Sequence, residues 1–213
     1  MIDTVEERKQ TLVEKLKERA TNIKAKELEE ICIILTDIST SMDEGCPNGE
    51  SKLMAVKRSI PYLQARGSYL MYSLIAFGSE AHLIQQPTSN FSTITLQADH
   101  LVTQGMTNIP AALKMGIKMT DESTALKKRM ILMTDGCNNE DGHLMEHSIQ
   151  SCIDKKVMVD TISFGRSADI NLLKSIAKRT GGMFQEADSP LALQQAYAKL
   201  NSQVRYLENK NGG

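Results

Sequence analysis

Side chains that could bind a hard metal ion occur in three separate stretches of this 213-residue chain. The first stretch follows a near-continuous apolar run and carries Asp37, Ser39 and Ser41 at alternate positions. The other two supply Thr107, within Gly-Met-Thr-Asn, and Asp135, within Thr-Asp-Gly. Oxygen donors without His or Cys favour Mg²⁺, Mn²⁺ or Ca²⁺ over zinc or copper. Because Mg²⁺ prefers a tight octahedron of oxygens and keeps several waters, it suits this small hydroxyl-rich set best.

The elements that must position these stretches are alternating strands and helices. Apolar runs of strand length predict strands buried on both faces, and apolar residues at helical spacing predict helices. The predicted strands cover residues 31–37, 69–77, 81–86, 129–134, 157–164 and 181–186. The predicted helices cover residues 51–65, 109–119, 143–154, 170–179 and 191–206. Residues 87–105 are predicted to form a loop with a short apolar-patterned stretch.

The connections between these elements predict the fold class. The Gly78-Ser79-Glu80 turn is so short that it forces an antiparallel strand pair. Strands separated by helices of roughly 10 to 15 residues imply right-handed crossovers and a parallel sheet. We therefore expect an α/β, three-layer, doubly wound (Rossmann-like) fold. Its six-stranded sheet should be mainly parallel, with one antiparallel edge strand and helices on both faces. Ligands of such folds bind beyond the carboxyl ends of the strands, and all three stretches are expected in loops at that edge.

Each candidate ligand has an ordinary structural explanation when it is taken alone. Ser and Thr after a strand commonly cap the next helix, and Asp135-Gly136 could simply form a turn. Five such residues on three loops at one edge favour a metal site instead. The three segments, in this order and on these elements, resemble the metal-ion-dependent adhesion site of von Willebrand factor A (vWA) domains. The resemblance covers about residues 30–207.

The resemblance also implies a role for each residue. The serines matching Ser39 and Ser41 bind the metal directly in the family, and the aspartate matching Asp37 orients ligands and water. The residues matching Thr107 and Asp135 exchange between direct and water-mediated contact. A Glu or Asp of a protein partner completes the coordination shell.

This reading predicts an interaction module and no enzyme. We expect divalent-metal-dependent binding of an acidic partner residue through Mg²⁺, in a stand-alone intracellular protein. Family members of that type belong to multi-protein assemblies and to bacterial stress and metal-resistance systems. The sequence departs from the family at Thr40, where many members have glycine. A β-branched residue makes that turn stiffer.

A metal-dependent hydrolase, either a peptidase or a phosphatase, is an alternative. His143 and His147 fit the H-x-x-E-H zinc signature, but Met145 and Ile149 belong to an apolar stripe that places both histidines on the solvent side of a helix. An Asp that ends the first strand resembles the aspartate-nucleophile phosphatases. Those enzymes need a second carboxylate two positions later, where this chain has Ser39.

Composition argues against several other classes. The 25 basic and 26 acidic side chains are spread along the chain, so no footprint for nucleic acid or membrane stands out. No window approaches a membrane span of about 18 apolar residues, and the N-terminus lacks the apolar core of a signal peptide, so a cytoplasmic protein is expected. Cys32 and Cys152 lie in apolar patterns and are predicted core residues. A pairing of Cys46 with Cys137 is a minor alternative.

Three segments make up the predicted domain organisation. Residues 1–30 form a charged helix with a weak heptad seam, residues 31–207 form the vWA domain, and residues 208–213 form a flexible tail. The N-terminal helix could pack along its own domain. It could instead drive oligomerisation, which gives a third hypothesis, an assembly element in which the metal site is secondary.

Overall fold

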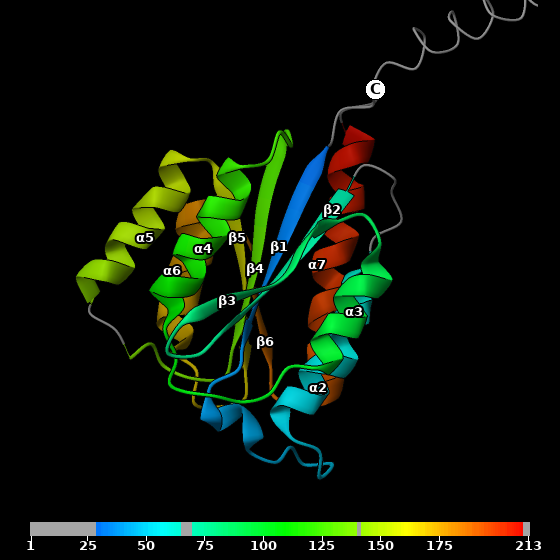
Figure 1. Ribbon diagram of the computed structural model, residues 1–213, viewed down its shortest axis with the longest axis vertical. Helices are drawn as coiled ribbons and strands as arrows, with labels where there is room; N and C mark the ends of the chain where they lie inside the picture. The colour runs from blue at the N-terminus through cyan, green and yellow to red at the C-terminus, as the bar shows by residue number, and fades with distance from the viewer. Residues whose placement is uncertain (1–28, 65–69, 140–141, 211–213) are drawn as a thin grey trace, which may run out of the picture.

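The computed structural model, which describes residues 29–64, 70–139 and 142–210, has a six-stranded sheet between two layers of helices (Figure 1). The strands are β1 (Glu30–Asp37), β2 (Leu70–Phe77), β3 (Ala81–Thr88), β4 (Lys127–Thr134), β5 (Val157–Phe164) and β6 (Phe184–Ala187). Their order is β3-β2-β1-β4-β5-β6. All neighbouring strands are parallel except β2 and β3. The predicted fold class, with its antiparallel edge strand, is therefore confirmed.

Helices cover both faces of this sheet. The α-helices are α2 (Lys52–Ser59), α3 (Phe91–Asp99), α4 (Ile109–Asp121), α5 (Gly142–Asp154), α6 (Ile170–Thr180) and α7 (Pro190–Lys210). Two 3-10 helices, η1 (Thr40–Asp43) and η2 (Ile60–Leu63), lie in the connections. Figure 1 shows α4, α5 and α6 on one face and α2, α3 and α7 on the other. None of the helices within the described ranges is long and apolar enough to cross a lipid bilayer.

Strand β1 lies at the centre of the core because its side chains pack on both faces. Ile31, Ile33 and Leu35 belong to the apolar cluster beneath α4, α5 and α6. Cys32 and Ile34 alternate with them and belong to the cluster beneath α2, α3 and α7. Side chains of successive strand residues point to opposite faces, so a strand covered on both sides is apolar at every position. This is why the run before Asp37 is nearly continuous.

The main error of the sequence analysis is α3, which forms within the predicted loop 87–105. Asn90 caps this helix, since its side chain accepts a hydrogen bond of 3.2 Å from the Ser92 amide. Phe91, Ile94 and Ala98 are buried on its inner face. The helix is short and contains several Ser and Thr residues with modest helix propensity, so tertiary packing decides its formation.

The ends of the other helices and strands differ less from the predicted ends. Helix α7 continues to Lys210, beyond the predicted end at residue 206. The predicted N-terminal helix lies outside the described residues except for its last two positions, and Glu30 belongs to β1. Any role of residues 1–28 in oligomerisation therefore stays a prediction.

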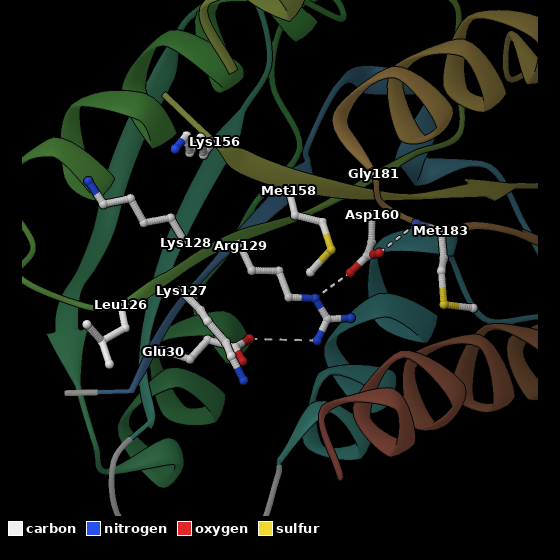
Figure 2. A pocket seen from close by; sticks show the side chains of 10 residues that line it. All are labelled: Glu30, Leu126, Lys127, Lys128, Arg129, Lys156, Met158, Asp160, Gly181 and Met183. Atoms are coloured by element: carbon white, nitrogen blue, oxygen red, sulfur yellow. Dashed lines mark hydrogen bonds and ion pairs between the residues drawn. The ribbon is translucent and has the colours of Figure 1, made fainter. Parts of the chain in front are cut away.

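The amino-terminal edge of the sheet contains a cavity of about 330 Å³ around a buried ion pair (Figure 2). Arg129 of β4 donates a hydrogen bond from Nε to Asp160 of β5, and both side chains are buried. The same guanidinium donates to the carbonyl of Leu200 in α7 at 3.0 Å, and the Asp160 carboxylate accepts from the Met183 amide at 2.7 Å. These bonds tie two central strands to α7 and to the chain entering β6. Since the cavity lies at the opposite end of the strands from Asp37, it is separate from the predicted metal site.

Candidate functional site

The loop that follows β1 is fixed directly to the loop that carries Thr107. Asp37 is the last residue of β1 and is fully buried. The Gln104 amide donates a hydrogen bond to the Ile38 carbonyl at 2.6 Å, and the Thr40 amide donates to the Gly105 carbonyl at 3.1 Å. The side chain of the β-branched Thr40 is exposed, and its amide still forms the hydrogen bond to Gly105. A threonine at this position is therefore compatible with the contact between the two loops. Two segments far apart in the sequence therefore lie side by side at the carboxyl edge of the sheet.

The structure brings all five predicted ligand residues together. The Ser39 amide donates to Oδ1 of Asp37 at 2.7 Å, and Oγ of Ser39 lies 3.1 Å from Oγ of Ser41. Oγ of Ser41 donates to Oδ1 of Asp135 at 2.7 Å. Oγ1 of Thr107 lies 3.5 Å from Oδ2 of Asp37, which completes the group. The predicted convergence is thus observed, while the binding of a metal by these residues stays a prediction.

Two asparagines that the sequence analysis did not identify hold the Thr107 loop in place. The Thr107 amide donates to Oδ1 of Asn139 at 2.9 Å, and the Asn139 amide donates to the Thr107 carbonyl at 2.9 Å. Oδ1 of Asn138 accepts a hydrogen bond of 3.1 Å from the amide of Ile109, in the first turn of α4. The Asn-Asn pair shortly after Thr-Asp-Gly was the available signal, because asparagine side chains commonly bond to nearby backbone in loops.

The environment of Asp37 makes its negative charge costly. Burial raises the pKa of this carboxyl above its usual range, and hydrogen bonds from Thr134 and Ser39 only partly oppose the effect. The nearby charge of Asp135 raises the pKa further. Thr134, whose hydroxyl donates to Oδ2 of Asp37, is a third residue that was not predicted from the sequence. A cation at this edge would stabilise the ionised form of Asp37.

Lys52 is the fourth unforeseen residue, and it brings a positive charge into the site. Its ammonium nitrogen lies 2.7 Å from Oδ2 of Asp135 and 2.5 Å from Oε2 of Glu44. Burial lowers the pKa of Lys52, but the hydrogen bonds and charges of Asp135 and Glu44 outweigh it and raise the pKa overall. The group is therefore a charged ammonium at neutral pH.

The donor set fits a small hard cation. It consists of two carboxylates and three hydroxyls, and no sulfur or imidazole belongs to it. Neighbouring ligands of an octahedral Mg²⁺ with bonds of about 2.1 Å are about 3 Å apart. The separation of 3.1 Å between Oγ of Ser39 and Oγ of Ser41 matches that spacing.

The helix that carries His143 and His147 has the predicted orientation. Met145, Ile149 and Cys152 are buried on the inner side of α5, whereas both histidines are exposed. All four cysteines are free thiols, so the alternative of a bond between Cys46 and Cys137 is not observed.

Gly78 supports the site because no side chain fits between it and the Thr107 loop. A Cβ at this position would lie 2.2 Å from the carbonyl oxygen of Gln104. We expect Gly78→Ala to displace that loop and to lower the free energy of unfolding by about 1 to 3 kcal/mol. Urea denaturation measures this loss, and Gly45→Ala is the matched control because its Cβ would have no neighbour within 4 Å. Equal midpoints for the two variants would contradict the prediction.

Several solved structures have the same fold as this chain, although their sequences are only 13–20% identical to it. The von Willebrand factor type A protein from Catenulispora acidiphila superposes with a TM-score of 0.73 at 20% identity, covering 81% of this chain and 42% of that one. A conserved hypothetical protein, BatB, from Bacteroides thetaiotaomicron superposes with a TM-score of 0.70 at 19% identity, covering 84% and 99%. The vWF domain of the type V pili tip protein Mfa5 from Porphyromonas gingivalis gives 0.69 at 13% identity, covering 84% and 96%. At these identities the likeness concerns the fold alone.

The family itself is identified by sequence comparison. Inter-alpha-trypsin inhibitor heavy chain H3 of Mus musculus is 24% identical over an alignment of 162 residues, and the match covers 67% of this chain. The chain spans only 18% of that relative's length. The sequence profile of the von Willebrand factor type A domain matches residues 32–138, just over half of the chain and the segment that carries all five clustered residues. The chain therefore belongs to the von Willebrand factor type A domain family.

Proposed function

We propose that this vWA domain is a protein-interaction module that binds an acidic residue of its partner through one divalent cation, with Mg²⁺ the preferred ion. The observation that carries the proposal is the clustering of five oxygen-bearing side chains from three loops, with two serine hydroxyls at the spacing of adjacent octahedral ligands. Domains of this family are typically protein-interaction modules. The proposed setting is a cytoplasmic multi-protein assembly.

One member of the cluster supports a cation bound near the surface. Ser41 is half-buried and follows the exposed Thr40, whereas Asp37, Ser39, Thr107 and Asp135 are buried. Ser39 and Ser41 would hold the ion from the protein side, and the carboxylates behind them would balance its charge. The bound ion would supply Lewis-acid attraction for one more oxygen ligand from solvent or a partner.

An apolar side chain beside the cluster of oxygen-bearing residues gives the partner a second contact. Met106 lies next to Thr107 and has 58% of its surface exposed. Methionine is flexible and polarizable, so it adapts to partners of different shape. A peptide with an acidic residue next to an apolar one matches this surface.

Peptide binding tests the function directly. Immobilised hexapeptides that pair one Glu or Asp with apolar neighbours should retain the protein in 5 mM Mg²⁺ and release it in EDTA. The amount of protein retained should be about tenfold or more higher in Mg²⁺, because EDTA removes one charge-assisted contact. The same peptides with Gln or Asn in place of the acidic residue are the matched controls. Retention that is equal in Mg²⁺ and EDTA, or equal for acidic and amide peptides, would exclude the proposed mode of binding.

The structure favours this function over hydrolysis. The position two residues after Asp37 is a serine whose hydroxyl contacts Ser41, so the carboxylate acid/base of a phosphatase is missing at that place. Glu146 of the H-x-x-E-H segment is paired with Arg179 through bonds of 2.7 and 2.6 Å. A carboxylate held in that way at a surface is poorly placed to act as a general base.

A further inference from the structure

Lys52 occupies a position where helix electrostatics disfavour a positive charge. It is the first residue of α2, immediately after the capping residue Ser51. The amino-terminal end of a helix carries a partial positive charge, so lysine there costs free energy unless another group compensates. The compensation comes from Asp135, which lies 83 residues away in sequence and accepts a hydrogen bond from the lysine at 2.7 Å.

The lysine side chain is also held in one place. Only 8% of the residue's surface is exposed, and its Cε lies 3.5 Å from where a Cβ on Gly165 would be. The ammonium group therefore cannot leave the site for solvent without losing packing and two ionic hydrogen bonds. This differs from an exposed lysine, whose contribution is screened and mobile.

Each carboxylate oxygen of Asp135 therefore has its own hydrogen-bond donor. Oδ1 accepts from Ser41 and Oδ2 accepts from Lys52, so the carboxylate is oriented with one oxygen toward the hydroxyl cluster. Lys52 determines which oxygen faces a cation at the hydroxyls.

We propose that Lys52 is a built-in cation of the metal site, which orients Asp135, weakens the affinity for divalent ions and leaves the loaded site with a surplus positive charge. The proposal rests on the proposed function, because it concerns the same site. Two buried carboxylates would neutralise a divalent ion, but Lys52 adds a third positive charge beside one of them. The loaded site then attracts one further negative group, which is the acidic residue of the partner.

Glu44 modifies this balance from the solvent side. Its side chain is 61% exposed, so water screens its charge far more than that of the fully buried Asp135. Glu44 therefore offsets only part of the Lys52 charge at the site. We expect Glu44→Gln to weaken Mg²⁺ binding by less than about threefold, in line with an exposed pair.

Calorimetric titration of Mg²⁺ into Lys52→Met tests the proposal, since this variant removes the charge and keeps an unbranched side chain. The expected result is Mg²⁺ affinity about tenfold tighter than that of the wild type, because Coulomb repulsion between the ammonium and the ion disappears. Binding of the acidic hexapeptides at saturating Mg²⁺ should become weaker in the same variant. Lys57→Met, on the same helix but bonded to the carbonyl of Asp99, is the matched control and should behave as wild type.

Thermal unfolding gives a second readout. In EDTA, Lys52→Met should unfold at a lower temperature than wild type because Asp135 loses its counter-charge, and Mg²⁺ should raise its Tm more than that of the wild type. If the methionine variant does not fold, the same Mg²⁺ titration is performed with Lys52→Gln. Equal or weaker Mg²⁺ affinity in a folded neutral variant would overturn the role of Lys52 while leaving the proposed function intact. If neither wild type nor variant binds Mg²⁺ or Mn²⁺, the proposed function itself fails.

Discussion

Asp37→Asn should weaken Mg²⁺ binding by at least about a hundredfold, since it removes one of two carboxylate charges and keeps the shape of the side chain. Asp37 accepts hydrogen bonds from the Ser39 amide and from Thr134, and Oγ1 of Thr107 lies 3.5 Å from it, so it joins two of the three loops. Isothermal titration with Mg²⁺ and Mn²⁺ measures the loss. Ser39→Ala and Ser41→Ala should each show a large loss as well, because they remove the hydroxyls proposed to bind the ion directly.

The same substitution should not destabilise the protein when metal is absent. Burial raises the pKa of Asp37, so the folded state holds the ionised carboxylate less favourably than the unfolded state does. The ionised group therefore opposes folding at pH values above its unfolded pKa, and the opposition disappears as pH falls through the raised pKa. A neutral Asn avoids this cost, so Asp37→Asn in EDTA at pH 7 should unfold at the same temperature as wild type or higher. A loss of metal affinity accompanied by a lower Tm would instead indicate that Asp37 acts mainly as a structural residue.

Arg129→Met should produce the largest loss of stability, about 3 to 5 kcal/mol in the free energy of unfolding. The substitution leaves Asp160 buried and without its ionic partner, and it also removes the bond to the Leu200 carbonyl. Urea denaturation of the EDTA-treated protein measures the change. The proposed metal site lies at the other end of the strands, so Mg²⁺ affinity should stay at the wild-type value under conditions where the variant is folded.

An exposed ion pair gives the matched control for this prediction. Arg179→Met breaks the bidentate pair with Glu146 on the surface of α5 and α6, where solvent screens both charges. Its urea midpoint should stay close to that of wild type. The double substitution Arg129→Met with Asp160→Leu should recover part of the lost stability, because it removes both partners of the close ion pair. The remaining loss reflects Glu30, which is buried and 3.9 Å from the Arg129 guanidinium. Similar midpoints for Arg129→Met and Arg179→Met would contradict the importance assigned to the buried pair.

The part of the fold that sequence could predict depends on local pattern. The runs that form β1 and β4 are buried on both faces, and a strand in that environment is apolar at nearly every position, which can be recognised in the sequence. Each run ends in a polar residue at the same edge, which is why the convergence of Asp37 and Asp135 followed from topology. Helix α3 was missed because its short sequence, rich in Ser and Thr, becomes helical mainly through the packing of residues such as Phe91 against Tyr72.

The missed residues of the site share a different property. Lys52 and Thr134 act on carboxylates that lie 83 and 97 residues away, so no local pattern reports their roles. Lys52 reads as an ordinary surface lysine of an amphipathic helix, and Thr134 reads as the last residue of a strand. For these two residues, the one unusual feature in the sequence was the positive charge of Lys52 at the start of α2.

A crystal of the protein grown or soaked with Mn²⁺ tests the proposed metal site, with anomalous scattering measured at the manganese absorption edge. We expect one strong peak at the carboxyl edge of the sheet, about 2.2 Å from Oγ of both Ser39 and Ser41, and no such peak in Asp37→Asn. A wild-type crystal with no peak between these two oxygens, or with manganese bound only elsewhere, would rule out a cation held by the two serines.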